Sequence, residues 1–215
     1  MFFFVKSNTK DFTIAFKAGK NPFKFFTIVS NIFMGLISLI LIPFDILSIR
    51  KNREKTPKFI SIIHLSAVSS VLLTFLVVVF YLTPLTMDKD NILSYFDAFK
   101  GTNLFYHFLI PVFAFGGFVF FPYKVRIKVK NAVFGIIPML IYSIFYISNV
   151  INNIENDFYH FVINGKIENI FYAVIAIYLI TYLISLLIIG IRIVIRKKNY
   201  PLTCRYERKN ISIDR

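Results

Sequence analysis

The chain has 215 residues, of which 57% are hydrophobic and 17% are charged, with a formal net charge of +14. A composition with so many hydrophobic residues argues against an ordinary soluble domain. The positive charge would suggest nucleic-acid binding in a soluble protein, but here it gathers between long apolar runs. We attribute it to loops on the cytoplasmic side of a membrane and expect no nucleic-acid partner.

Residues 1–22 form a polar N-terminal segment. Its apolar start at Met1 is soon interrupted by charged residues, among them Lys6, Lys10 and Asp11. A segment so broken by charge does not span a membrane. It also lacks the small-residue cleavage site of a secretory signal, so we do not expect a cleaved signal peptide.

Apolar runs of the length that a membrane-spanning helix needs occupy most of the remaining chain. A helix that rises about 1.5 Å per residue needs about 20 residues to cross a hydrocarbon core of about 30 Å. The runs cover residues 23–49, 59–84, 102–123, 132–151 and 170–195. They predict an all-α, polytopic transmembrane helical bundle of about five spans over residues 23–196, followed by a basic tail at 197–215.

The distribution of Lys and Arg predicts the orientation of this bundle. Segments on the side of the C-terminus carry about twice as many Lys and Arg as those on the side of the N-terminus, and cytoplasmic loops are the richer ones. We therefore expect the N-terminus outside and the C-terminus in the cytoplasm. The bias toward Lys, Ile, Asn and Phe with no Trp is what we expect of an AT-rich bacterial genome, and so of a multi-pass protein of the cell membrane.

Two polar residues stand at similar depths in the first and third spans. Thr27 and His107 each lie about one turn into a span that enters from the same side. Together a hydroxyl and an imidazole can act as nucleophile and general base toward an acyl carbonyl. Asn31 lies four residues after Thr27 and Asn103 four before His107, which puts each on the same helix face as its partner. Asn31 or Asn103 would serve as an oxyanion or orienting donor.

Each of these residues also has a purely structural reading. A threonine near a span start often bonds to its own helix, and a buried histidine is often a packing residue. Pro111 cannot donate to the His107 carbonyl, so we expect the helix to kink or open there. His160, in the last external loop, would bind a headgroup or orient the site; the alternative is a solvated loop histidine.

Two short motifs resemble those of the androgen-induced protein family and its bacterial relatives. They are FFTIVSN at residues 25–31 and NLFYHFLIP at residues 103–111. The resemblance covers about residues 23–151 and implies a threonine hydrolase of the kind that cleaves fatty-acid esters of hydroxy fatty acids. In that family the matching threonine and histidine form the catalytic pair, which implies Thr27 as nucleophile and His107 as base.

The chain departs from the family in its number of spans. The family usually has six spans with the threonine at the start of the second, whereas no apolar run precedes Thr27 here. Loss of one leading span would place the N-terminus outside, in agreement with the charge distribution. It would also leave a gap the size of one helix, and the alternatives are a truncated or miscalled start, a partner helix, or completion by a homo-oligomer.

No cofactor or metal is expected. The three histidines fall on both sides of the membrane, and the sequence has no H-E-x-x-H motif and a single cysteine, Cys204. The activity we expect is hydrolysis of a lipid acyl ester, with the lipid bilayer and a lipid ester as partners. The alternatives are a non-catalytic membrane scaffold or assembly subunit and, less compatible with charges at the span ends, a small transporter.

Overall fold

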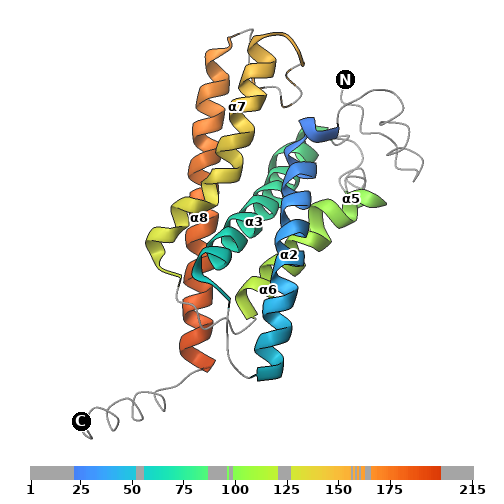
Figure 1. Ribbon diagram of the computed structural model, residues 1–215. Helices are drawn as coiled ribbons and strands as arrows, with labels where there is room; N and C mark the ends of the chain where they lie inside the picture. The colour runs from blue at the N-terminus through green and yellow to red at the C-terminus, as the bar shows by residue number, and fades with distance from the viewer. Residues whose placement is uncertain are drawn as a thin grey trace, which may run out of the picture.

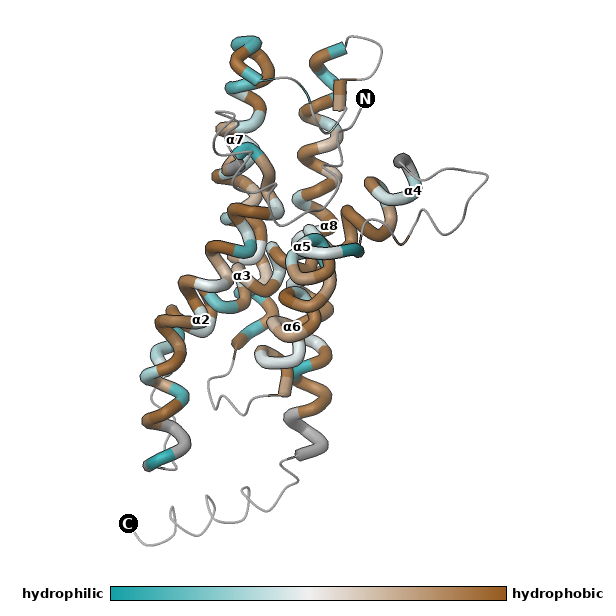
Figure 2. The backbone as a smooth tube through the Cα atoms, turned by 90° about the vertical axis from the view of Figure 1, so that its right-hand side faces the viewer, coloured by the Kyte–Doolittle hydropathy of each residue, from teal (hydrophilic) through white to brown (hydrophobic). Residues whose placement is uncertain are grey.

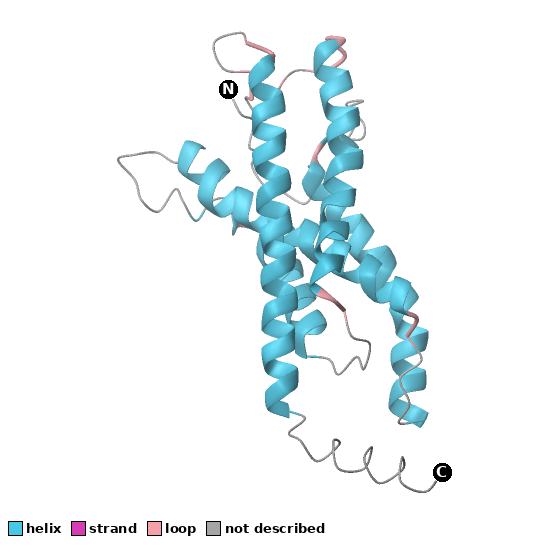
Figure 3. Cartoon of the chain, turned by 90° about the vertical axis from the view of Figure 1, so that its left-hand side faces the viewer, coloured by secondary structure: helices cyan, strands magenta, loops and turns pink. Residues whose placement is uncertain are grey.

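The computed structural model describes residues 22–51, 56–86, 96, 99–120, 127–155, 157, 159, 161–162 and 166–199. Most of the predicted N-terminal segment, most of the basic tail and His160 lie outside these residues. Helices dominate the described part of the chain, which contains no β-strand (Figure 3). The all-α prediction is therefore confirmed.

Five of the described helices are long and apolar enough to cross a membrane. They cover Phe26–Leu47, Lys58–Leu82, Thr102–Phe120, Val129–Ile151 and Glu168–Ile195. The predicted runs overlap all five, so the five-span prediction is confirmed. Apolar residues colour most of each helix along its length (Figure 2), as expected for helices whose outer faces meet lipid.

Three of the five spans are not continuous α-helices. The elements in chain order are η1 (Pro22–Lys24), α2 (Phe26–Lys51), α3 (Lys58–Val77), the π-helix η2 (Val78–Leu82), α4 (Thr83–Thr86), α5 (Thr102–Leu104), the π-helix η4 (Phe105–Leu109), α6 (Ile110–Phe120), the 3₁₀ helix η5 (Val129–Ile136), α7 (Ile137–Ile151) and α8 (Glu168–Asn199). Both π-helices lie just before a proline, Pro84 or Pro111. A proline removes one backbone hydrogen-bond donor. In a π turn the neighbouring backbone hydrogen bonds join residues five apart instead of four.

The helix α3 forms the centre of the bundle. In its most apolar stretch 61% of the residues are buried, against 22–33% in the other four spans. It contacts α2, α6, α7, α8 and η5, while α7 packs along the N-terminal half of α8 (Figure 1). Because the number of spans is odd, α2 begins at the end of the bundle opposite to the one where α8 finishes. We call these the Phe26 end and the Asn199 end.

Four hydroxyl groups on α3, those of Ser66, Ser69, Ser70 and Thr74, face the interior and are bonded there. Ser66, Ser70 and Thr74 each donate to the carbonyl four residues earlier, at 3.1, 2.8 and 3.1 Å. Ser69 bonds Ser185 of α8 at 2.8 Å. In a membrane a hydroxyl without a partner is costly, so this face turns inward and joins helices that the hydrophobic effect does not hold together.

Gly135 allows η5 to approach α3 and α8 closely. A Cβ at this position would overlap the Ser185 hydroxyl and would lie 3.0 Å from Ser185 Cβ and 3.2 Å from Ser69 Oγ. No side chain larger than hydrogen fits here unless Ser185 of α8 shifts. The Ser69–Ser185 bond would be lost with that movement.

We expect Gly135→Val to lower the free energy of unfolding by about 1–3 kcal/mol, the usual cost of overpacking. Unfolding of the purified chain in mixed micelles measures it. The matched control is Gly190→Val on α8, where an added Cβ meets nothing within 4 Å. Equal losses in the two variants would contradict close packing at Gly135.

The orientation of the bundle in the membrane stays a prediction from the charge distribution. We expect a membrane-impermeant maleimide to label Cys204 only after cells are opened, because the tail is basic and predicted to be cytoplasmic. The control is a chain with Cys204→Ser and Asn152→Cys, which moves the single thiol to the exposed turn after α7 at the opposite end. Labelling of Cys204 in intact cells would reverse the orientation.

Candidate functional site

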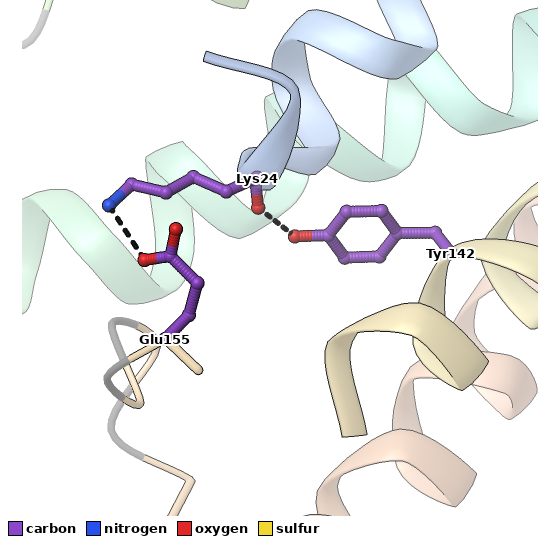
Figure 4. A network of polar contacts seen from close by, with 3 residues as sticks. All are labelled: Lys24, Tyr142 and Glu155. Carbon is purple, nitrogen blue, oxygen red and sulfur yellow. Dashed lines mark hydrogen bonds and ion pairs between the residues drawn. The ribbon is translucent and has the colours of Figure 1, made fainter. Parts of the chain in front are cut away.

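Tyrosines from distant segments hold the first turn of α2, where Thr27 lies. Residue 25 is a phenylalanine and cannot cap the helix as Ser, Thr, Asp or Asn would. Instead the Phe26 N–H donates to the Tyr159 hydroxyl at 3.1 Å, and Tyr142 donates to the Lys24 carbonyl (Figure 4). Burial raises the pKa of the Tyr159 phenol, so this group stays neutral and able to accept a bond at neutral pH.

Thr27 lines a small cavity near the Phe26 end. The cavity measures about 40 Å³, which is room for about two or three water molecules. Its polar groups come from α2, α3, α7 and the loop before α8, and its other walls are apolar. The lining residues are Phe26, Thr27, Leu73, Thr74, Val77, Val78, Leu82, Met139, Tyr142, Tyr146, Tyr159, Phe161, Val174 and Ile177.

His107 occupies the middle of the π-helix η4. The Ile110 N–H bonds the Phe105 carbonyl, five residues earlier, and Pro111 follows without an N–H. The predicted opening of the helix at this place is therefore confirmed. His107 Nδ1 is buried and has no hydrogen-bond partner within the described part of the chain. A buried ring nitrogen without a partner is costly in a purely structural residue.

Asn31 joins the Thr27 segment to the His107 segment. Its Nδ2 donates to the Thr27 carbonyl at 2.7 Å and to the Tyr106 carbonyl at 3.4 Å. The two carbonyls are thus neighbours across the contact between α2 and η4. The amide acts here as a clamp between backbones, and its Oδ1 is buried with no bond to any described residue.

The two side chains predicted as a catalytic pair do not bond each other. Among the described residues the Thr27 hydroxyl takes part in no hydrogen bond, and His107 does not line the cavity that contains Thr27. The clamp brings their backbones together and leaves both side-chain groups available. Asn103 lies half-buried in α5, one helical turn before His107, and His160 is outside the described residues.

Sequence reasoning did not single out the tyrosines of this site. Tyr142 and Tyr146 stack at 6.2 Å with an angle of 14° between their rings, and Tyr146 donates to Asp157, which also accepts from the Val162 N–H at 2.6 Å. The spacing of four residues between Tyr142 and Tyr146 was a signal that both lie on one face of a helix. Nothing local marked Tyr159 as the group that caps α2, because it lies 133 residues from Phe26.

One ion pair lies at the rim of the site. Lys24 Nζ is 3.3 Å from Glu155 Oε2, and the two side chains are 23% and 30% exposed (Figure 4). No group of three or more His, Cys, Asp or Glu in the described residues lies close enough to hold a metal ion.

Comparisons of the chain with protein-family models, with curated proteins and with solved structures find no match. The resemblance to the androgen-induced protein family therefore stands on the two motifs around Thr27 and His107. Any activity assigned to the chain has to rest on those motifs and on the geometry of its own residues.

Proposed function

We propose that this integral membrane protein hydrolyses acyl esters of lipids, with Thr27 as nucleophile and His107 as general base. The observation that carries the proposal is a pair of side-chain groups without partners in the described chain, on two segments whose backbones meet at the α2–η4 contact. One is the Thr27 hydroxyl, and the other is the buried His107 Nδ1 without a partner in the described chain. Hydrogen bonds between catalytic groups are often absent before substrate binds, and they form in the complex.

The chemistry proceeds in two halves. His107 accepts the Thr27 hydroxyl proton while Oγ1 attacks the ester carbonyl carbon and forms a tetrahedral oxyanion. Collapse of that oxyanion breaks the bond to the alcohol oxygen, which takes the proton from His107 and leaves an acyl-threonine. Water then attacks the acyl group with His107 again accepting a proton, and Thr27 and a free fatty acid result.

The cavity beside Thr27 supports the second half. It has room for about two or three water molecules, and the hydroxyls of Thr27 and Thr74 give such water polar partners. Most of its walls are apolar, and apolar surroundings strengthen electrostatic interactions with an oxyanion. Asn31 serves in this proposal as an orienting residue, because its amide holds two backbone carbonyls.

The test uses the full chain, purified and reconstituted in liposomes, with a fatty-acid ester of a hydroxy fatty acid as substrate. We expect release of free fatty acid, and in heavy-oxygen water we expect the new oxygen in the acid and not in the alcohol. The matched ether analogue should remain intact. Release no faster than in empty liposomes would favour a membrane scaffold, in which the same polar residues only hold helices together.

A further inference from the structure

A second and larger recess lies beside the site, between the start of α2 and α7. It measures about 350 Å³, which falls within the range of about 300–1,000 Å³ typical of small-molecule sites. Tyr142 and Tyr146 line both this groove and the cavity of Thr27, so the two tyrosines form the wall between them. The groove is lined by Phe23, Lys24, Val29, Pro138, Ile141, Tyr142, Phe145, Tyr146, Asn149 and Glu155.

The groove is divided into a polar end and an apolar trough. Lys24, Glu155 and Asn149 lie near the Phe26 end, where the helices leave the membrane. Val29, Ile141 and Phe145 line the deeper part, and Ile141 and Phe145 are 52% and 65% exposed, so the trough opens sideways toward lipid. An amphiphile lying along α7 would meet charges at one end only.

The depth of the trough matches one leaflet. From Asn149 to Pro138 the helix rises about 16 Å at about 1.5 Å per residue, and half of a hydrocarbon core of about 30 Å is about 15 Å. An acyl chain whose headgroup lies at the polar end therefore reaches the bottom of the groove.

The charges at the polar end favour a zwitterionic headgroup. An ammonium carries three N–H donors and a carboxylate about four lone-pair sites, so the Lys24–Glu155 pair can extend into a network of four charges. A lipid phosphate would bind Lys24 and a lipid ammonium would bind Glu155. An anionic lipid without an ammonium would place its phosphate near the Glu155 carboxylate, and Lys24 of this ion pair would have to balance two negative charges.

We infer that this groove binds a glycerophospholipid of the phosphatidylethanolamine class, with its phosphate on Lys24, its ammonium on Glu155 and an acyl chain along Ile141 and Phe145. The inference concerns binding and does not depend on ester hydrolysis by Thr27. A chain that hydrolyses nothing would still bind this lipid.

Native mass spectrometry of the full chain in detergent tests the inference. The probes are a phosphatidylethanolamine, a phosphatidylglycerol with the same acyl chains, the matching diacylglycerol and free phosphoethanolamine. We expect the first to bind most tightly. Diacylglycerol binding as tightly as phosphatidylethanolamine would overturn the role of the headgroup, and free phosphoethanolamine binding as tightly would overturn that of the acyl chain.

Variants separate the parts of the groove. Lys24→Gln should weaken phosphatidylethanolamine binding by about twofold to fivefold, as for one partly exposed charged contact. Glu155→Gln should weaken the binding of phosphatidylethanolamine by a similar factor but strengthen the binding of phosphatidylglycerol. General unfolding of the chain would not produce such opposite changes. If Glu155→Gln weakens the binding of both lipids, or strengthens the binding of both, the contact assigned between the lipid ammonium and Glu155 is overturned.

The trough has its own variant and control. Ile141→Trp fills the groove and should reduce phosphatidylethanolamine binding by about tenfold, whereas Leu179→Trp, on the lipid-facing surface of α8 and outside the groove, should not. Equal binding by these two variants would overturn the groove as the site. A dimer in the spectrum that excludes lipid would show that a helix of a second copy occupies the groove instead.

Discussion

Thr27→Ala is expected to lower the rate of lipid ester hydrolysis by about a thousandfold or more, the usual effect of removing a nucleophile or its base. His107→Ala should lower it by a similar factor, and the double variant by little more, because the two groups act as one unit. Thr27→Ser keeps the hydroxyl and should retain most of the activity. Release of fatty acid from a lipid ester in liposomes measures all four.

The control for this series is Ser38→Ala, which removes a hydroxyl from the same helix. Ser38 lies on the exposed face of α2 and donates only to the Met34 carbonyl, at 2.9 Å. It should leave hydrolysis unchanged. Full activity in Thr27→Ala would contradict the assignment and would direct attention to Thr74, whose side chain lines the same cavity.

Phe118→Ala is expected to lower the free energy of unfolding by about 3–5 kcal/mol, the usual cost of truncating a buried phenylalanine. Phe118 is fully buried near the Asn199 end. Its ring meets the His64 ring edge-on at 5.0 Å and lies under the Arg192 guanidinium, with 4.7 Å to the ring centroid. The truncation therefore opens a cavity and also removes a cation–π contact from an arginine that is only 6% exposed.

The matched control is Phe113→Ala on the same helix. Phe113 is 73% exposed on the face that meets lipid, so its removal exchanges one apolar contact for another and should change the free energy of unfolding little. Unfolding in mixed micelles compares the two. Losses of equal size would contradict the packing of α6 against α3 and α8.

The five spans could be predicted because their cause is local. A run of about 20 apolar residues satisfies its own backbone only as a helix in a membrane, and each of the five runs has that length. The position of the break at His107 was also local, since it follows from the missing N–H of Pro111. The matching π-helix η2 before Pro84 was not foreseen, although Pro84 lacks an N–H in the same way.

The surroundings of Thr27 could not be predicted in the same way, because they depend on contacts between distant segments. The cap of α2 comes from Tyr159. Asn31, which bonds the Thr27 carbonyl, also bonds the carbonyl of Tyr106, 75 positions further along the chain. Apolar periodicity says little about such partners when a helix is apolar on every side. Asn31 was singled out from its spacing to Thr27, but its second bond to η4 required the fold.

The measurement that tests the central claim most directly is mapping of a fluorophosphonate lipid probe on the full chain in native membranes. The probe forms a bond between phosphorus and an activated hydroxyl oxygen and releases fluoride. We predict a single adduct on Thr27 that is absent from His107→Ala at matched expression. An adduct on another residue, or no adduct on a chain that is folded, would contradict a Thr27–His107 catalytic pair.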